Sequence, residues 1–315
     1  MPIEARVSRF FMRDVFFIVG PTATGKSEIT ADVAGDIGAE IVSADAFQVY
    51  RGLDLLTAKP DAATLAKVPH HLIGTMSILE EMNAEKFRKL ALGAISQIHS
   101  RGKLAIVVGG SGLYVKALTH GLSITPAADP DLRAQLNELS LADLQKKLRE
   151  LDPKTPVDLK NRRRVVRAIE ICMLSGKPAS GQRTGWSAAE TAAASTQGIF
   201  VFRERDDLYQ RINARIEAMF ENSVIEEVRA VGAMSETAAK MIGLREIRDL
   251  LGGKTSILQC VVAIQQATRR YAKRQLTWFR RQTNFQPLNL SVLSHVESVK
   301  WISQKAHLAF AQGND

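Results

Sequence analysis

The chain has 315 residues, of which 45% are hydrophobic and 24% are charged, the composition of an ordinary globular protein. Its two cysteines form no CxxC pair, and no segment approaches the roughly 20 apolar residues that span a bilayer, which argues against a zinc site, a disulfide framework and a membrane protein. Lysine and arginine outnumber aspartate and glutamate by 42 to 33, and the net charge of +9 favours a polyanionic partner such as a nucleic acid, although a generally basic surface would give the same surplus. We expect a cytoplasmic protein.

Buried strands alternate with helices in the first part of the chain. Continuous apolar runs predict strands at 13–20, 39–45 and 103–110, and the segments 26–38 and 84–102 have the pattern of helices. Strands without polar alternation are typical of a parallel sheet that helices cover on both faces. The sequence therefore predicts an α/β fold with a doubly wound parallel sheet.

The pattern changes after residue 121. A Pro/Asp-rich break at 123–131 precedes helical segments that continue to 195, and an apolar run at 198–207 returns to the sheet. The chain beyond 285 is weakly patterned. We predict a catalytic core formed by 14–121 together with 198–285, a mostly helical insertion domain at 122–197 and a C-terminal tail at 286–315.

A phosphate-binding loop follows the first strand. The sequence GPTATGKS matches G-x-x-x-x-G-K-[ST] between a strand and a helix, and the backbone N–H groups of such a loop form an anion site. Lys26 adds a positive charge and the Ser27 hydroxyl can ligate Mg²⁺. The motif predicts a polyphosphate site without saying which bond breaks. Its residues are Gly20, Pro21, Thr22, Ala23, Thr24, Gly25, Lys26 and Ser27.

A carboxylate and a polar loop follow the second strand. Asp45 stands at the strand end, where it could act in catalysis, join a Mg²⁺ shell or cap a helix. The loop after it supplies amide, hydroxyl and amino groups that could read the edge of a base, namely those of Gln48, Tyr50, Arg51, Thr57 and Lys59.

The third strand ends in VVGGSGLY. Gly109 and Gly110 would let the backbone approach a ligand closely, and Ser111 offers a hydroxyl there. Because the carboxyl ends of parallel strands meet at one edge of the sheet, we expect Ser111, Asp45 and the phosphate loop to face each other.

Several longer segments together resemble one family. The segments GPTATGKS, SADAFQVYRGLDLLTAKP, PHHLI, VVGGSGLYVKAL, RRRVVRAIEICMLSGKP, RDDLYQRINARIEAMF, IGLREI and ATRRYAKRQLTWFRR fall in the order and spacing of bacterial tRNA dimethylallyltransferases, over roughly residues 15–285. The resemblance implies a P-loop NTPase-like sheet and the transfer of a dimethylallyl group from dimethylallyl diphosphate to N6 of adenosine 37 in tRNAs that read codons starting with U. The chain departs from the family at Ala46, Gly74, Ser111 and Leu244, where Ser, Asp, Thr and Tyr are common.

The resemblance also implies roles for individual residues. Asp45 would take the proton from N6, Ser111 would bond the bridging oxygen that breaks away, and Lys26 would stabilise the leaving diphosphate with Mg²⁺ on Ser27. One or more of three arginines would close over the diphosphate, and the sequence leaves open which of Arg205, Arg211 and Arg215 does so.

The partner that the resemblance implies is a tRNA anticodon stem-loop, bound by a monomer. Two basic stripes on predicted helices, one at 163–167 and one at 269–281 with Tyr271 and Trp278 among its members, suit phosphate contacts, although charged faces are often only solvated. The implied tRNA-binding residues are Asp45, Ala46, Phe47, Gln48, Ser111, Arg133, Arg163, Arg164, Val165, Val166, Arg167, Lys240, Met241, Ile242, Gly243, Leu244, Arg245 and Arg274.

Two other functions use part of the same pattern. A P-loop small-molecule kinase would share the phosphate loop and the catalytic carboxylate, but it does not explain TRRYAKRQLTWFRR or the net charge. A basic RNA-binding NTPase-like module would explain the charge but would leave Asp45 and Ser111 without a role.

Overall fold

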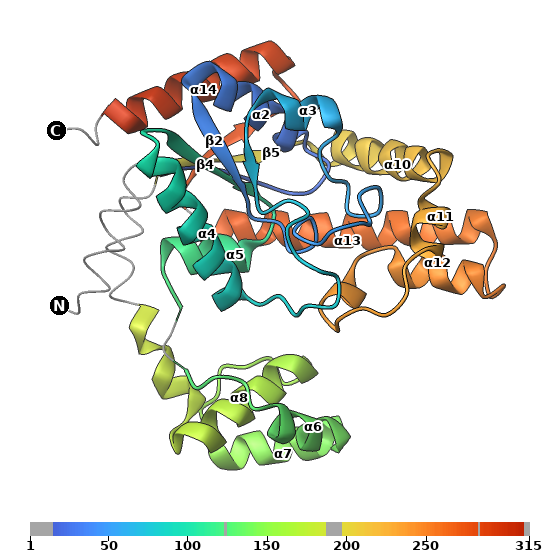
Figure 1. The fold of residues 1–315 in the computed structure, drawn as a ribbon. Helices are drawn as coiled ribbons and strands as arrows, with labels where there is room; N and C mark the ends of the chain where they lie inside the picture. The colour runs from blue at the N-terminus through green and yellow to red at the C-terminus, as the bar shows by residue number, and fades with distance from the viewer. Residues whose placement is uncertain (1–14, 123–124, 187–196, 283, 312–315) are drawn as a thin grey trace. The chain divides into compact units, whose positions relative to one another are not determined.

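The computed structural model describes residues 15–122, 125–186, 197–282 and 284–311 (Figure 1). The chain divides into two compact units, one formed by Met1–Thr119 with Ala194–Asp315 and the other by His120–Ala193. Within the described ranges no helix is long and apolar enough to cross a membrane. The Ala-rich stretch at 187–195 lies outside the described residues.

The first unit is built on a parallel sheet of six strands in the order β3-β2-β4-β1-β5-β6. All five residues of β1 and of β2 are buried, as the unbroken apolar runs predict. The predicted parallel sheet is therefore confirmed. The strands are β1 (Val15–Val19), β2 (Ala39–Ser43), β3 (His70–His71), β4 (Leu104–Gly109), β5 (Gln197–Phe202) and β6 (Gln286–Asn289).

Helices cover both faces of this sheet. Alternate residues of β1 point to opposite faces, so Phe16 and Ile18 pack in one core and Phe17 and Val19 in the other. The first core also contains α2 (Lys26–Ile37) and α14 (His295–Ala311). The second core contains α4 (Ala84–Ser100), α5 (Gly112–Thr119), α10 (Arg205–Glu221), α11 (Val224–Arg229), α12 (Leu244–Leu251) and α13 (Ile257–Gln282), while α3 (Ala62–Lys67) and the 3₁₀ turn η2 (Ala238–Lys240) lie in the connections.

The segment beyond residue 285 is not a tail, in contrast to the prediction. β6 pairs with β5 at the edge of the sheet, and α14 packs against α2. The strand β6 could not be predicted from the sequence, because it has four residues, of which only Leu288 is buried. The buried face of α14 is made largely of small residues, Ser298, Ser303, Ala306 and Ala309, which give no strong apolar period.

The second unit is a helical bundle, so the predicted helical insertion is confirmed. It consists of α6 (Pro130–Glu138), α7 (Leu141–Leu151), α8 (Arg162–Ser175) and the 3₁₀ turn η1 (Ala179–Trp186) around a core of its own. Each α-helix begins at a side-chain cap that accepts a backbone hydrogen bond, supplied by Asp129, Ser140 and Asn161.

The packing of α14 can be tested at Ile302, which is fully buried on that helix. We expect Ile302→Ala to lower the free energy of unfolding by about 2–4 kcal/mol, because the substitution leaves a cavity in a close-packed core. Leu308→Ala on the same helix is the matched control, since Leu308 is 58% exposed. Denaturant titrations of both variants measure the difference, and equal losses would show that α14 does not belong to the core.

Candidate active site

Three strand-end loops are tied to one another at the carboxyl edge of the sheet. The Gly20 N–H donates to the Gly109 carbonyl at 3.2 Å, and the Ser111 N–H donates to the Ala44 carbonyl at 3.3 Å. Asp45 directly follows Ala44. The structure thus brings together the phosphate loop, Asp45 and Ser111, which the sequence places at three separate strand ends.

Two polar side chains of the phosphate loop bond back to the loop itself. The buried Thr24 hydroxyl donates to the Pro21 carbonyl at 3.1 Å, and the Lys26 ammonium donates to the same oxygen at 3.2 Å. Burial lowers the pKa of Lys26 to about 8, although the nearby Asp45 carboxylate acts in the opposite direction. The Lys26 charge therefore lacks the counter-charge that a bound polyphosphate would supply.

One carboxylate oxygen of Asp45 holds a turn of the backbone, and the other faces the site. Its Oδ1 accepts hydrogen bonds from the backbone N–H groups of Phe47 at 2.9 Å and Gln48 at 3.2 Å. It therefore caps a turn, not the helix that was one of the alternatives. Oδ2 accepts no hydrogen bond from the described part of the chain. The two backbone contacts fix the orientation of the carboxylate.

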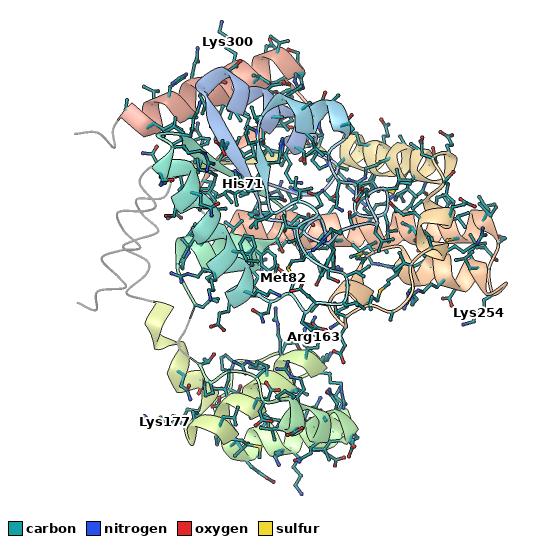
Figure 2. The ribbon with its side chains drawn as sticks, in the orientation of Figure 1. His71, Met82, Arg163, Lys177, Lys254 and Lys300 are labelled. Carbon is teal, nitrogen blue, oxygen red and sulfur yellow. The ribbon has the colours of Figure 1, made fainter. Side chains whose placement is uncertain are left out.

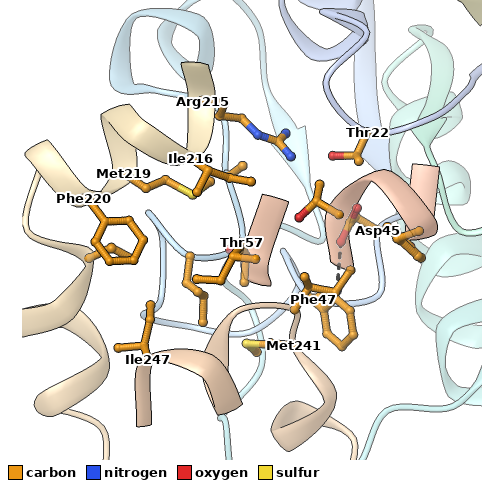
Figure 3. A pocket seen from close by; sticks show the side chains of 17 residues that line it. Thr22, Asp45, Phe47, Thr57, Arg215, Ile216, Met219, Phe220, Met241 and Ile247 are labelled. Carbon is orange, nitrogen blue, oxygen red and sulfur yellow. Dashed lines mark hydrogen bonds between the residues drawn. The ribbon is translucent and has the colours of Figure 1, made fainter. Parts of the chain in front are cut away.

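Two cavities meet at Asp45. The smaller one is lined by Asp45, Lys26, Ser27 and the ring of His70. The larger one has Asp45, Thr22 and Arg215 at one end and an apolar wall at the other (Figure 3). That wall consists mainly of Met219, Phe220, Val224, Met241, Ile247 and Ile264. An anion-binding loop therefore opens onto an apolar chamber, with one carboxylate between them.

The candidate arginines separate into different environments. Arg215 lines the larger cavity, and its Nε is buried without a hydrogen-bond partner among the described residues. Burial lowers the pKa of Arg215 to about 10, and Asp45 partly offsets this effect. Arg211 Nε donates to the Ala23 carbonyl at 3.0 Å. The guanidinium of Arg205 instead stacks on the Tyr209 ring, 5.3 Å from its centroid.

The sequence does not single out Arg203, which also reaches the phosphate loop. Its Nε donates to the Thr24 carbonyl at 2.8 Å, and its Nη1 bonds Asp207 at 2.9 Å. Arg203 stands between β5 and α10, just before the run of arginines that resembles the family. The sequence offered one signal for Arg203, since a residue that directly follows a predicted strand lies at the edge of the sheet where the phosphate loop is expected.

The polar loop after Asp45 is largely occupied with its own structure, in contrast to the prediction that it reads a base edge. Gln48 Nε2 donates to the Ala58 carbonyl at 2.8 Å, and the buried Tyr50 hydroxyl bonds Thr237 at 2.8 Å. The Thr57 hydroxyl donates to the Leu53 carbonyl at 2.7 Å. The ammonium of Lys59, whose side chain is 7% exposed, bonds the Tyr50 carbonyl and pairs with Asp54. Contacts of this kind, within the loop or with Thr237, leave no trace in a sequence pattern.

The glycines at the end of β4 serve protein packing, not the close approach of a ligand that the sequence suggests. A Cβ on Gly109 would lie 2.3 Å from the Ala44 carbonyl oxygen, and one on Gly110 would lie 2.3 Å from Nε2 of Gln275. A side chain on Gly109 would collide with backbone, and one on Gly110 would displace the Gln275 amide. These glycines allow the loop of Asp45 and helix α13 to pack directly against the end of β4.

The candidate tRNA-binding residues differ in exposure. Met241 and Leu244 are buried in the sheet unit, and Val165 and Val166 are buried in the helical unit, so the side chains of these four pack in cores, against the implied RNA contact. Lys240, Arg245 and Arg274 are exposed, and the Arg274 guanidinium lies over the ring of Tyr271.

A buried carboxylate organises the arginines of the helical unit. Glu170 is fully buried, and it binds both Arg133, at 2.5 and 2.6 Å, and Arg167, at 3.1 Å. Arg167 also donates to the Pro126 carbonyl at 2.7 Å. Arg163 and Arg164 are exposed at the start of α8, and Arg163 projects from its helix in Figure 2. Arg133 and Arg167 therefore have structural roles that the sequence does not reveal.

The fold and the site define a P-loop enzyme of the group-transfer class with an apolar chamber beside its phosphate loop. The family model described as IPP transferase matches residues 48–282. The chain therefore belongs to the IPP transferase family.

Individual relatives agree with this assignment over most of the chain. The chain is 41% identical to tRNA dimethylallyltransferase 1 from Citrifermentans bemidjiense over 293 residues, covering 90% of this chain and 95% of the relative. It is 42% identical to a tRNA dimethylallyltransferase from Geobacter sulfurreducens, covering 84% of this chain and 88% of that protein. The solved structure of full-length tRNA isopentenylpyrophosphate transferase from Bacillus halodurans matches with a TM-score of 0.70 and 34% identity, covering 95% of this chain and 97% of that one.

The different environments of Arg215 and Arg205 predict different effects on anion binding. We expect Arg215→Met to weaken the binding of inorganic pyrophosphate to the free protein by about 10- to 100-fold, the range for one lost charge-assisted hydrogen bond. Arg205→Met, the matched control on the same helix, should change the affinity by less than about threefold, since an exposed charge contributes little. Isothermal titration calorimetry measures both constants, and the reverse order of effects would contradict the placement of Arg215.

Proposed function

We propose that this enzyme transfers a dimethylallyl group from dimethylallyl diphosphate to N6 of adenosine 37, beside the anticodon of tRNAs that read codons starting with U. The observation that carries the proposal is the position of Asp45 between the phosphate loop and an apolar chamber. An isoprenoid diphosphate has a charged end and an apolar end, and this site offers a matching surface for each.

The donor would lie with its diphosphate at the loop and its hydrocarbon against the apolar wall. The N–H groups where the loop enters α2 would bind the phosphate oxygens together with Lys26, and Arg215 would approach the same anion from α10. Binding of the diphosphate stabilises Lys26 and Arg215 strongly, because both are desolvated and neither has a full counter-charge in the free protein. Met219, Phe220 and Ile247 would contact the five-carbon group.

Asp45 would act as the base in the transfer. The exocyclic amine of adenine is a weak nucleophile because its lone pair is delocalised into the ring. In the reaction N6 forms a bond to C1 of the dimethylallyl group, the C1–O bond to diphosphate breaks, and the N6 proton passes to Oδ2 of Asp45. The hydrogen bonds that hold Oδ1 leave Oδ2 as the oxygen that meets the amine.

The leaving group takes both electrons of the C1–O bond, so negative charge develops on the bridging oxygen. Lys26 and the loop N–H groups stabilise that charge, and the Ser111 hydroxyl would donate to the bridging oxygen itself. Because the charge on this oxygen grows during the reaction, the contact with Ser111 strengthens in the transition state.

Mg²⁺ fits the donor set of the smaller cavity. The Ser27 hydroxyl lines it beside Lys26, and the described residues contain no group of three His, Cys, Asp or Glu side chains that could hold a metal without the donor's phosphates. Ser27 would therefore hold the ion together with phosphate oxygens and water, and the bound ion would neutralise charge on the diphosphate.

The acceptor would be the anticodon stem-loop, from which adenosine 37 leaves its stack to reach Asp45. Extrusion of a base from a single-stranded loop costs a few kcal/mol by typical estimates, less than from a duplex. Arg163 and Arg164 are exposed cations suited to phosphate contacts. The protein would act as a monomer.

The kinase alternative finds less support in this site. A nucleoside triphosphate would place a ribose and a base beyond its phosphates, and both need polar partners. The larger cavity instead presents methionine, phenylalanine and isoleucine side chains beyond its polar end.

Asp45→Asn provides the direct test of the proposed chemistry. Asparagine keeps the oxygen that caps the turn but cannot take the proton, so kcat should fall by about 10²- to 10⁴-fold. The affinity for unmodified tRNA should stay within about twofold, because the shape of the turn is retained. Quantification of isopentenyladenosine in digested tRNA gives the rate, and near wild-type turnover would reduce Asp45 to a structural cap.

The role of Arg163 and Arg164 is tested by salt dependence. Each phosphate contact contributes about 0.7–0.9 to the slope of log affinity against log salt, so the double change to Ala should flatten the slope for tRNA by about one to two units. The control is the double change of Lys146 and Lys154 to Ala, which removes two exposed charges from the same unit. Arg167 is left intact because its pair with Glu170 supports the fold. Equal slopes for the two double variants would contradict the proposed contact.

A further inference from the structure

A buried glutamine on α13 joins two of the loops that form the site. Gln275 is 6% exposed, and its Oε1 accepts a hydrogen bond from the Thr22 N–H at 3.0 Å. Its Nε2 donates to the Gly110 carbonyl at 2.9 Å. The first partner belongs to the phosphate loop, and the second precedes Ser111. One side chain thus spans the gap between the diphosphate cradle and the loop that carries Ser111.

The chemistry of the two partners fixes the orientation of this amide. A backbone N–H can only donate, so the group facing Thr22 must be the amide oxygen. A carbonyl can only accept, so the group facing Gly110 must be the NH₂. A glutamine side chain satisfies both partners at once. A substitution that removes one contact would leave a polar group without a partner in a buried position.

The surroundings of Gln275 show how closely α13 approaches the Ser111 loop. A Cβ on Gly110 would lie 2.3 Å from Nε2 of Gln275, and a Cβ on Gly112 would lie 2.4 Å from the ring of Trp278. The glycines on both sides of Ser111 therefore let α13 pack so close to the Ser111 loop that the Gln275 amide can bond it. This packing leaves little freedom for Ser111 to move relative to α13.

The same face of α13 continues into the larger cavity. Tyr271, one turn before Gln275, lines that cavity together with Asp45. Burial and the Asp45 charge raise the pKa of Tyr271, so it remains a neutral donor. Gln275 therefore bonds the phosphate loop and the Ser111 loop from a helix whose previous turn contributes to the cavity wall.

We propose that Gln275 is a positioning residue that sets the spacing between the phosphate loop and Ser111. The proposal rests on the proposed function, in which the diphosphate is held by one loop and its bridging oxygen is met by the hydroxyl of the other. Gln275 is not among the residues that line either cavity, so it would not touch the substrates. Its two hydrogen bonds keep the Ser111 hydroxyl within reach of the leaving oxygen. The loss of these bonds should therefore lower the rate of transfer more than the affinity for the donor.

Two variants separate this role from the general stability of the helix. Gln275→Met keeps the length of the side chain but removes both hydrogen bonds, and Gln275→Asn keeps the amide but is one methylene too short to bridge the two loops. Both should lower kcat by about 10- to 100-fold, the cost of a misplacement of about 1 Å, while the KM for dimethylallyl diphosphate changes by less than about threefold.

A matched control lies on the same helix. Gln265 is also buried, but its Nε2 bonds Glu217, away from both loops. Gln265→Met should leave kcat within about twofold, and its melting temperature shows how much stability the loss of one buried glutamine removes. All rates are measured below the melting temperature of the least stable variant. A loss of kcat in the control equal to that in Gln275→Met would overturn the proposal.

A double-variant cycle with Ser111→Ala provides the decisive readout. If Gln275 acts by placing the Ser111 hydroxyl, Gln275→Met should cost less in kcat when that hydroxyl is already absent, so the combined loss should be at least about threefold smaller than the product of the single losses. Multiplicative losses, or a Gln275→Met variant with wild-type kcat, would overturn the positioning role. A wild-type protein that forms no isopentenyladenosine would instead overturn the proposed function.

Discussion

The whole site depends on two backbone hydrogen bonds that tie neighbouring strand ends together, one from Gly20 to Gly109 and one from Ser111 to Ala44. Parallel strands bring their carboxyl ends to one edge but do not fix the loops there. These bonds hold the phosphate loop, the turn of Asp45 and the Ser111 loop in direct backbone contact with one another. The cavities that Asp45 lines form around this framework.

Electrostatic imbalance is the second feature that defines the site. Lys26 and Arg215 both lose solvent in it, and the pKa of each is lowered despite the Asp45 carboxylate nearby. Two desolvated cations with one anion between them raise the free energy of the unbound protein, and a bound diphosphate would supply the missing negative charge. The helical unit differs, because its buried charge is the Glu170 carboxylate, and the two arginines that pair with it keep 43% and 33% of their side chains exposed.

The sequence predicts the parts of this structure that depend on local patterns. Unbroken apolar strands, the glycine–lysine–serine loop and the position of Asp45 at a strand end all follow from short stretches of chain. Contacts between distant segments could not be predicted. Gln275 bonds Thr22 across 253 positions. Bonds inside an irregular loop, such as those of Lys59 and Gln48, were equally hidden because they follow no periodic pattern. Helix α14 was missed because small buried residues give a weak period.

The central claim is that the phosphate loop holds an isoprenoid diphosphate and that the bond broken is carbon–oxygen. The most direct measurement incubates the protein with Mg²⁺ and unmodified tRNA, together with either dimethylallyl diphosphate or ATP, and analyses the digested nucleosides by mass spectrometry. The account predicts isopentenyladenosine in the digest with dimethylallyl diphosphate and unmodified adenosine with ATP. Unmodified adenosine with dimethylallyl diphosphate, or a phosphorylated product with ATP, would contradict it.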